Sequence, residues 1–446
     1  MKLWQKDTAV DKAVEQFTVG RDKEFDQLLA PFDVLGNIAH AKMLASVGLL
    51  TAEEADQLVK RLQKIYPTTL DTDFVIPEGM EDIHSYVEYL LTQELGDTGK
   101  KIHAARSRND QVLVDIKLFL RYELQQLVRS IEPFFALLQE QSEAYKDHLL
   151  PGYTHLQLAM PSSFGLWFGA YAESLVDDLQ TLQAAYKVVN KNPLGSAAGY
   201  GSSFPINRTL TTELLGFEHL NYNVVYAQMG RGKAERIVAQ AMANLADTLS
   251  KLSMDMCIYL NQHFDFISFP AELTTGSSIM PHKKNPDVFE LIRSHCNRIK
   301  ALPNEITMMT TNLPSGYHRD LQLLKEHLFP AFQTLQQCIQ MAALMLSNIH
   351  IKPDILKDEK FKYLFTVDAV NELVKQGTPF RDAYKIIGKQ VEDGSFNMPD
   401  APAPTTHEGS IGNLCNAEIA AMMQQVLNGF GFEQAEQAVS RLLNPA

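Results

Sequence analysis

Apolar residues recur at helical spacing over most of this chain, and the apolar/polar alternation typical of strands is nearly absent. The spacing is clear on one helical face made by Val112, Ile116, Phe119, Leu120, Leu124, Leu127 and Ile131. Segments with this pattern cover about 107–149, 161–190, 229–263, 287–311 and 320–350. They exceed the ~11–12 residues of an average helix. The pattern therefore predicts an all-α protein built on a central bundle of long helices.

The chain is also too long for a single core. Its 446 residues exceed the usual size of one domain, and 45% apolar content is enough for more than one core. Lys352-Pro353 follows the last long segment, and a proline-rich break runs from Met398 to Thr405. We expect three helical domains: an N-terminal one over 1–105, the long-helix bundle over 106–350 and a C-terminal one over 351–446.

Charge and cysteine spacing exclude several function classes. A formal net charge of -13 argues against a surface that follows nucleic-acid phosphates. The cysteines show no ligand spacing, so we expect buried, reduced thiols, no metal site and no cofactor; they are Cys257, Cys296, Cys338 and Cys415. Charged residues interrupt the N-terminal stretch MKLWQKDTAVDKAVEQF, and no segment approaches membrane-spanning length. We therefore expect a cytoplasmic protein without a secretory peptide or a membrane partner.

The run GSSIMPHKKNP, from Gly276 to Pro286, is the segment most suited to chemistry. Ser277 brings a hydroxyl, and Lys283 and Asn285 bring donors that suit carboxylate oxygens. No packing requirement explains this combination. The alternative for such a stretch is a solvated basic loop between two helices.

A second polar group, GYTHLQ, precedes the second long helix, which we expect to begin near Pro161-Ser162. It holds Thr154, His155 and Gln157 beside apolar sequence. A single histidine in this position is more often a cap or a satisfied neighbour than a catalyst, so both interpretations stay open on this segment alone.

A third group, ARSRNDQ, opens the first bundle helix with Ser107, Arg108 and Asn109. Ser107 or Asn109 could cap that helix. Capping does not account for all of these residues, because cationic and neutral donors are gathered where the helix dipole already favours anions. The group suits a dicarboxylate ligand.

GSSIMPHKKNP and GYTHLQ resemble shared regions of the fumarase/aspartase superfamily, whose members eliminate fumarate from succinyl compounds. Together with further runs they resemble the argininosuccinate lyase family, in the same order from about Phe25 to Gly388; these runs are ARSRNDQ, GMEDIHSYVE, PLGS, LPSGYHRDLQLLKE and VDAVNELVKQGTPFRDAYKIIG. The resemblance implies a three-domain helical homotetramer of dihedral symmetry, with each active site shared among three chains. It also implies a small-molecule substrate, split into arginine and fumarate.

The resemblance assigns roles position by position. Ser277 resembles the general base, and Lys283 and Asn285 the residues that hold the enolate-like carboxylate. His155, paired with Glu290, would serve the leaving-group side. The remaining positions match substrate contacts: Ser107, Arg108, Asn109, Thr154, Gln157, Tyr317, Gln322, Lys325, His84 and Asp26.

The chain departs from the family pattern in four places, one of which is the absence of the family's glycine-rich arginine motif from MKLWQK. Gly20-Arg21-Asp22 stands where a serine is usual, and 227–232 reads AQMGRG instead of a Ser-Asp-Arg-Asp run. His282 replaces a usual glutamine and resembles adenylosuccinate lyase. An N-acylated argininosuccinate or adenylosuccinate therefore stays open as the substrate. A catalytically silent, crystallin-like structural protein is another alternative; the presence of all five expected residues argues against it, namely Ser277, His155, Lys283, Asn285 and Glu290.

Overall fold

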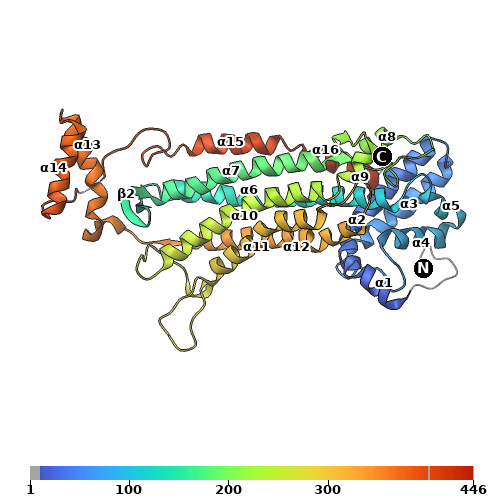
Figure 1. Ribbon diagram of the computed structural model, residues 1–446, viewed down its shortest axis with the longest axis horizontal. Coiled ribbons are helices and arrows are strands. Elements are labelled where there is room, and N and C mark those ends of the chain that lie inside the picture. Colours follow the sequence, from blue (N-terminus) through green and yellow to red (C-terminus); the bar gives the residue numbers. More distant parts are fainter. Residues whose placement is uncertain (1–10, 400–401, 445–446) are drawn as a thin grey trace.

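The computed structural model describes residues 11–399 and 402–444. It is an elongated, mainly helical molecule in which five long helices run along the longest axis (Figure 1). They are α6 (Arg108–Ala144), α7 (Phe164–Val189), α10 (Lys233–Leu260), α11 (Asp287–Thr310) and α12 (Leu324–Ser347). The prediction of an all-α bundle is confirmed. The first ten residues, part of the stretch behind the secretory-peptide expectation, lie outside the described residues, as do residues 400–401 of the proline-rich break.

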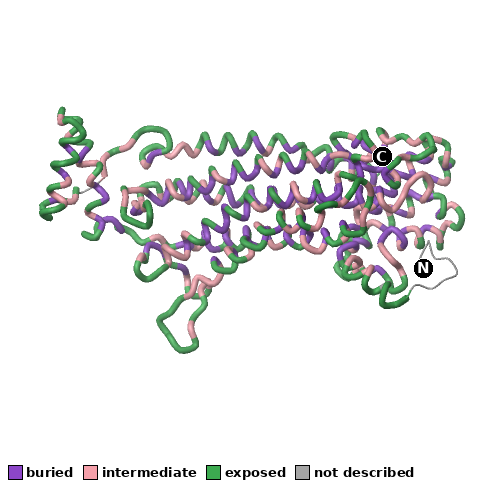
Figure 2. Tube along the Cα trace, viewed as in Figure 1, coloured by how far each residue is buried: buried purple, intermediate pink, exposed green. Residues whose placement is uncertain are grey.

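Local sequence sets where the longest helix, α6, begins. The Ser107 hydroxyl accepts from the backbone N–H of Asn109, and the Asp110 carboxylate accepts from the backbone N–H of Ser107. Along α6 the apolar positions expected from the spacing are buried, except Val112, which is half-buried. Buried residues follow the inner sides of the long helices (Figure 2). The same helix therefore supplies a polar N-terminus and a core face.

Two apolar cores hold the described part of the molecule together. The larger runs through the bundle, where α10 packs on α11, α6 on α7, and α12 on α6 and α11. The smaller lies at one end, around α2 (Asp22–Ser46), α3 (Ala52–Thr68) and α4 (Ile83–Leu95). Helix α2 belongs to both cores, so it ties the N-terminal helices to the bundle. The short helices α1 (Lys12–Val19) and α5 (Asp97–Lys100) lie at the same end (Figure 1).

The C-terminal part occupies two places. Helices α13 (Thr366–Lys375) and α14 (Phe380–Glu392) pack together at the far end of the bundle (Figure 1). Helix α15 (Asn416–Asn428) then runs back along α7, and α16 (Phe432–Leu443) packs on α2 and α8 (Arg208–Leu214). The boundaries of the three expected domains stay a prediction.

Short strands and 3-10 turns join the helices. The strands pair as β1 (Leu149–Thr154) with β2 (Gln157–Ser163), β3 (Lys191–Asn192) with β4 (His219–Leu220), and β5 (Ile267–Ser268) with β6 (His350–Ile351). The remaining short elements are α9 (Val224–Met229), η1 (Lys101–His103), η2 (Ala271–Leu273), η3 (Arg319–Leu323), η4 (Ile355–Lys357) and η5 (Glu359–Phe365).

Two sequence expectations are wrong in detail. Pro161 lies in strand β2 instead of opening a helix, and α7 begins at Phe164 because the Ser163 hydroxyl caps it by accepting from Leu166 N. All four cysteines are free, but only Cys296 and Cys338 are buried. The other two are half-buried. Within the described ranges, no helix has the length and apolar character needed to cross a membrane.

Candidate active site

A hollow of about 200 Å³ opens where α1, α2, α4 and the start of α6 meet the segment around η3. Seven residues expected at the site line it: Asp26, His84, Arg108, Asn109, Tyr317, Gln322 and Lys325. The other lining residues are Val19, Asp22, Glu81, Asp82, Val112, Arg231 and Arg319. Helix packing thus brings side chains as far apart in the sequence as Val19 and Lys325 into one charged pocket.

The N-terminus of α6 forms one wall of the hollow. Arg108 contacts Glu81 and Asp82 at 3.1 and 2.9 Å and donates to Ser85 Oγ at 2.6 Å. These acceptors hold the guanidinium in place beside the first turn. Ser107 does not line the hollow; its hydroxyl serves as the helix cap, as the alternative interpretation anticipated.

A buried lysine forms the opposite wall. Lys325 is 3% exposed, and its Nζ lies 2.6 Å from Asp22 Oδ1 and 2.5 Å from Asp26 Oδ1. Burial opposes the charge on Lys325, but Asp26 and Asp22 outweigh it and raise the pKa of the ammonium group. Burial and the neighbouring Asp26 raise the pKa of Asp22 to about 6, against the pull of Lys325. Asp22, which belongs to the departing stretch Gly20-Arg21-Asp22, is therefore an ion-pair partner in the hollow.

The segment 227–232, which also departs from the family pattern, mainly contacts other parts of the fold and not the hollow. Gln228 is buried and donates to Ala197 O at 3.2 Å, in the segment after PLGS. Arg231 donates to Leu321 O at 2.9 Å, and its Nε lies 3.3 Å from Glu235 Oε1. Only Arg231 of this pair lines the hollow.

Gln322 also has structural partners, because its amide donates to the carbonyls of Thr18 and Val19 at the end of α1. Arg319 donates to the same Thr18 carbonyl at 3.0 Å. Tyr317 is partly exposed at the rim. These contacts close the hollow on the side of α1.

The residues of GYTHLQ lie on the β1–β2 hairpin. Thr154 pairs with Gln157, so His155 and Leu156 form a two-residue turn, with φ of 54° and 58°. Positive φ at both positions is typical of the type I′ turn, although neither residue is the usual glycine or asparagine. Gly152 allows the strands to approach, because a Cβ there would lie 2.7 Å from Met160 O. The fold thus projects His155 into solvent at the hairpin tip.

The residues of GSSIMPHKKNP lie on a loop that projects from the bundle before α11 (Figure 1). Ser277 Oγ accepts from the backbone N–H groups of Met280 and Ile279 at 3.1 and 3.4 Å. Asn285 N donates to Thr275 O at 2.8 Å and closes the base of the loop. Ser277 is half-buried, and Lys283 is exposed.

One chain does not bring all the expected catalytic residues together. The hollow lies near the N-terminal helices, whereas the hairpin tip and the projecting loop belong to the other half of the molecule (Figure 1). His155 and Glu290 are both exposed, and no hydrogen bond or ion pair joins them in the described part of the chain. The expected His155–Glu290 pair is therefore absent within a single chain.

Some lining residues were not selected from the sequence. Glu81 and Asp82 fall inside the run GMEDIHSYVE, so their position beside His84 was a usable signal. Behind the hollow, Asp33 and Asp115 contact the His84 ring. Both carboxylates are buried in helices, where a buried charge needs a partner.

Comparison with known proteins gives consistent likenesses. A family model described as Lyase matches residues 4–301. Argininosuccinate lyase of Bacteroides fragilis is 60% identical over 442 residues, covering 99% of each chain. The argininosuccinate lyase of Bacteroides thetaiotaomicron is 59% identical with the same coverage.

Solved structures share the fold at low identity. An EDDS lyase variant with bound fumarate superposes with a TM-score of 0.78 at 20% identity, over 98% of this chain and 94% of that one. A class II fumarase from Schistosoma mansoni gives a TM-score of 0.73 at 17% identity, over 99% and 96% of the two chains. At this identity the likeness establishes the architecture alone.

Proposed function

Because this chain belongs to the argininosuccinate lyase family, we propose that it splits argininosuccinate into arginine and fumarate, as a step of arginine synthesis in the cytoplasm. The observation that carries the proposal is the sequence identity with argininosuccinate lyases, which extends over nearly the whole of both chains. The hollow agrees with it in charge, since its lining combines the cations Arg108 and Lys325 with carboxylates of α2 and of the segment just before α4. Such a pocket suits a substrate with both cationic and anionic groups.

The residues of the projecting loop supply the chemistry in this proposal. Ser277 takes the proton from the carbon beside a succinyl carboxylate, and that electron pair forms the double bond of fumarate as the C–N bond breaks. The two backbone N–H groups at Ser277 Oγ favour its charged form. Lys283 and Asn285 hold the enolate-like carboxylate. The departing guanidino nitrogen receives its proton on the His155 side.

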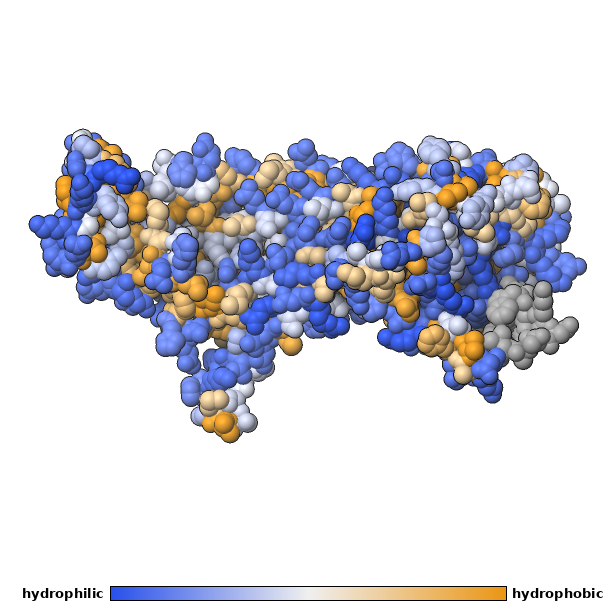
Figure 3. Space-filling model, in the orientation of Figure 1, coloured by the Kyte–Doolittle hydropathy of each residue, from blue (hydrophilic) through white to orange (hydrophobic). Residues whose placement is uncertain are grey.

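We further propose that the working form is a homotetramer in which different chains supply the hollow, the hairpin and the loop. The separation of these three parts within one chain supports this arrangement (Figure 1). Apolar side chains exposed on the loop also support it, since Ile279 is 83% exposed beside Met280, and the loop ends in an apolar tip (Figure 3). Such a tip is expected to be covered by another chain.

The decisive experiment measures fumarate release by ultraviolet absorbance with a panel of substrates. The panel contains argininosuccinate, its N-acylated form, adenylosuccinate and aspartate. We expect the highest kcat/KM with argininosuccinate. A higher value with another member would reassign the substrate within the same elimination chemistry, and release from none would leave the structural-protein alternative.

A further inference from the structure

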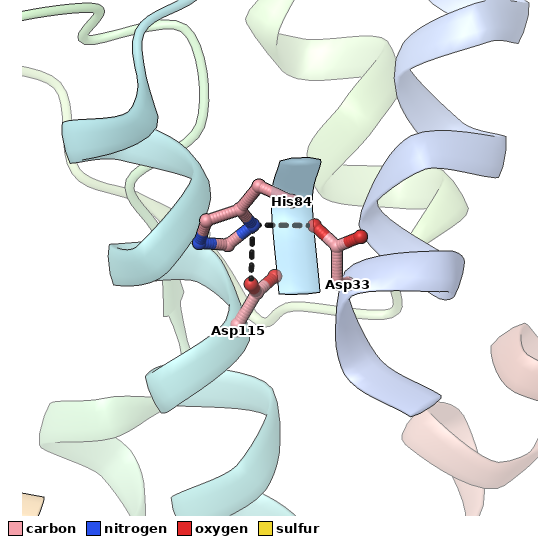
Figure 4. Close-up of side chains that lie close together, drawn as sticks. All are labelled: Asp33, His84 and Asp115. Carbon is pink, nitrogen blue, oxygen red and sulfur yellow. Dashed lines mark hydrogen bonds and ion pairs between the residues drawn. The ribbon is translucent and has the colours of Figure 1, made fainter. Parts of the chain in front are cut away.

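Three side chains from three helices meet in the buried wall behind the hollow. His84 Nδ1 of α4 lies 2.8 Å from Asp33 Oδ1 of α2 and 3.5 Å from Asp115 Oδ2 of α6. The ring is 7% exposed, and its second nitrogen points away from both carboxylates (Figure 4). Since His84 also lines the hollow, this arrangement leaves that nitrogen as the polar group available to a ligand.

A chain of hydrogen bonds sets the orientation of Asp33. Its second oxygen accepts from Asn37 Nδ2 at 2.9 Å, and Asn37 Oδ1 accepts from Arg106 at 2.5 Å. Both Asn37 and Arg106 are thereby committed to holding one rotamer of Asp33. The oxygen that remains faces the His84 ring.

Asp115 contributes a second carboxyl group without competing donors. It is 1% exposed, and both of its oxygens lack a hydrogen-bond partner in the described part of the chain. Its Oδ2 lies 3.5 Å from His84 Nδ1, at ion-pair distance. Burial and the neighbouring Asp33 raise the pKa of Asp115, whereas the charged His84 ring lowers it. The carboxylate form of Asp115 and the charged form of the ring therefore stabilise each other.

Charged groups face this cluster from every element around it. Acidic groups are Asp33 and Asp26 on α2, Asp82 at the start of α4, Glu88 on α4 and Asp115 on α6; basic or titratable groups are Arg106, Arg108 and His103. Burial alone would lower the pKa of His84, but Asp33, Asp115 and Asp82 raise it to about 10.

The same three residues have ligand atoms within 4.8 Å of one another, a spacing that could accept a metal ion. The 2.8 Å distance between Nδ1 and Oδ1 is that of a hydrogen bond, and the Arg106 guanidinium already acts on Asp115. The geometry therefore favours a proton between these groups.

We propose that Asp33, backed by Asp115, is a positioning residue that holds His84 as an imidazolium and directs its second N–H at a carboxylate of the substrate. The identity of that substrate rests on the proposed function. In a neutral ring, the proton on Nδ1 would bond Asp33 and leave a lone pair on Nε2, which repels a carboxylate. Only the doubly protonated ring satisfies Asp33 and the ligand together, and its bond to the ligand is charge-assisted.

The test compares KM and kcat of Asp33→Asn with those of the parent between pH 6 and pH 9. Removing the carboxylate lowers the pKa of His84, because Asp33 is the group that most strongly opposes the effect of burial. We expect the variant-to-parent KM ratio to rise ~10-fold or more from pH 6 to pH 8, with a smaller change in kcat. Asp178→Asn is a matched control. Asp178 is buried in the bundle core, where it accepts a hydrogen bond from the Thr248 hydroxyl. The variant-to-parent KM ratio of this control should not vary with pH.

A second pair of variants separates positioning from general structural damage. In a His84→Gln background, adding Asp33→Asn should produce no further pH-dependent change in KM, because the ring it acts on is gone. For Asp115→Asn, the variant-to-parent KM ratio should change with pH in the same direction as for Asp33→Asn. Asp115→Asn therefore replaces Asp33→Asn in the test if Asp33→Asn does not fold. A KM ratio that stays flat with pH in both variants would overturn the proposal.

Two measurements keep this inference separate from the proposed function. If the parent releases no fumarate from argininosuccinate, the proposed function fails, but calorimetric titration with fumarate over the same pH range still reports the charge on His84. Elemental analysis addresses the remaining alternative. One equivalent of a divalent metal bound to the parent but absent from Asp33→Asn would show that a metal ion, not a proton, lies between His84 and the two carboxylates.

Discussion

Lys325 Nζ lies 2.6 Å from Asp22 Oδ1 in the buried wall of the hollow. Asp22 belongs to a stretch that departs from the family pattern, and its carboxylate adds a negative charge to the hollow at the proposed amino-acid end of the substrate. The lysine also contacts Asp26, so one cation is shared between two carboxylates. This sharing determines how the site should respond to acid.

The first prediction concerns Asp22 and pH. Since burial and Asp26 raise its pKa to about 6, Asp22 is charged above that pH and gains a proton as the pH falls through it. We expect kcat/KM to fall below about pH 6, because a neutral Asp22 no longer attracts a cationic substrate group. For Asp22→Asn, kcat/KM should already be low at pH 8 and should not fall further as the pH drops below about 6. The exposed Asp247→Asn should match the parent, and an unchanged acid limb in Asp22→Asn would assign the decline to another group.

The second prediction concerns the proposed base. Ser277→Ala should reduce kcat at least ~10²-fold, while leaving substrate binding close to that of the parent, because the hydroxyl moves a proton and contributes little to holding the ligand. Fumarate release and a binding titration measure the two effects. Ser278→Ala is the neighbouring control. Turnover within a factor of ~10 of the parent would move the base elsewhere.

The third prediction concerns sharing of the site between chains. His155→Asn and Lys283→Ala should each be inactive, but a mixture unfolded and reassembled together should regain part of the activity, because some mixed sites contain neither change. Each variant reassembled alone is the control. No recovery, with mixing proven by mass spectrometry of tagged chains, would mean that each chain builds its own site.

The fourth prediction concerns specificity at the amino-acid end. A hollow that pairs a buried cationic group should discriminate against an analogue without it, and such losses reach ~10⁴-fold. We expect kcat/KM for argininosuccinate to exceed that for the N-acylated form by a large factor. If Asp22 pairs with the cationic group of the substrate, Asp22→Ser should reduce the difference in kcat/KM between the two substrates. A preference of the parent for the acylated form would contradict the assignment.

The fifth prediction concerns stability. Asp110 accepts from the backbone N–H groups of Ser107, Gly195 and Ala197 at 2.8, 2.9 and 2.9 Å. Asp110→Ala leaves these donors unpaired, at a cost on the order of 3 kcal/mol. The urea midpoint should fall, and it should fall less for Asp110→Asn, which keeps one acceptor oxygen. Equal midpoints for the parent and Asp110→Ala would show that water replaces the carboxylate.

Several features of the site could be predicted because they depend on neighbours within a few residues. The Ser107 cap is one, since a hydroxyl next to a helix start has its acceptor role set by the adjacent backbone. The buried face of α6 is another, because residues three and four positions apart lie on the same side of a helix. The start of α7 was missed because the Pro161 segment pairs with Pro151 across the hairpin, and a sequence window does not reveal that partner.

The sequence by itself determined the helical class, the polar segments between helices and the chemical groups available for catalysis. Only the tertiary structure decided which of these groups meet. Asp33, His84 and Asp115 come from three helices and become one cluster because the faces of α2, α4 and α6 pack together. In the same way, packing unites Asp22 with Lys325, whereas no hydrogen bond or ion pair joins His155 to Glu290 within the described part of one chain. Helical spacing encodes contacts one turn apart, whereas contacts between distant segments depend on how whole apolar faces fit against one another.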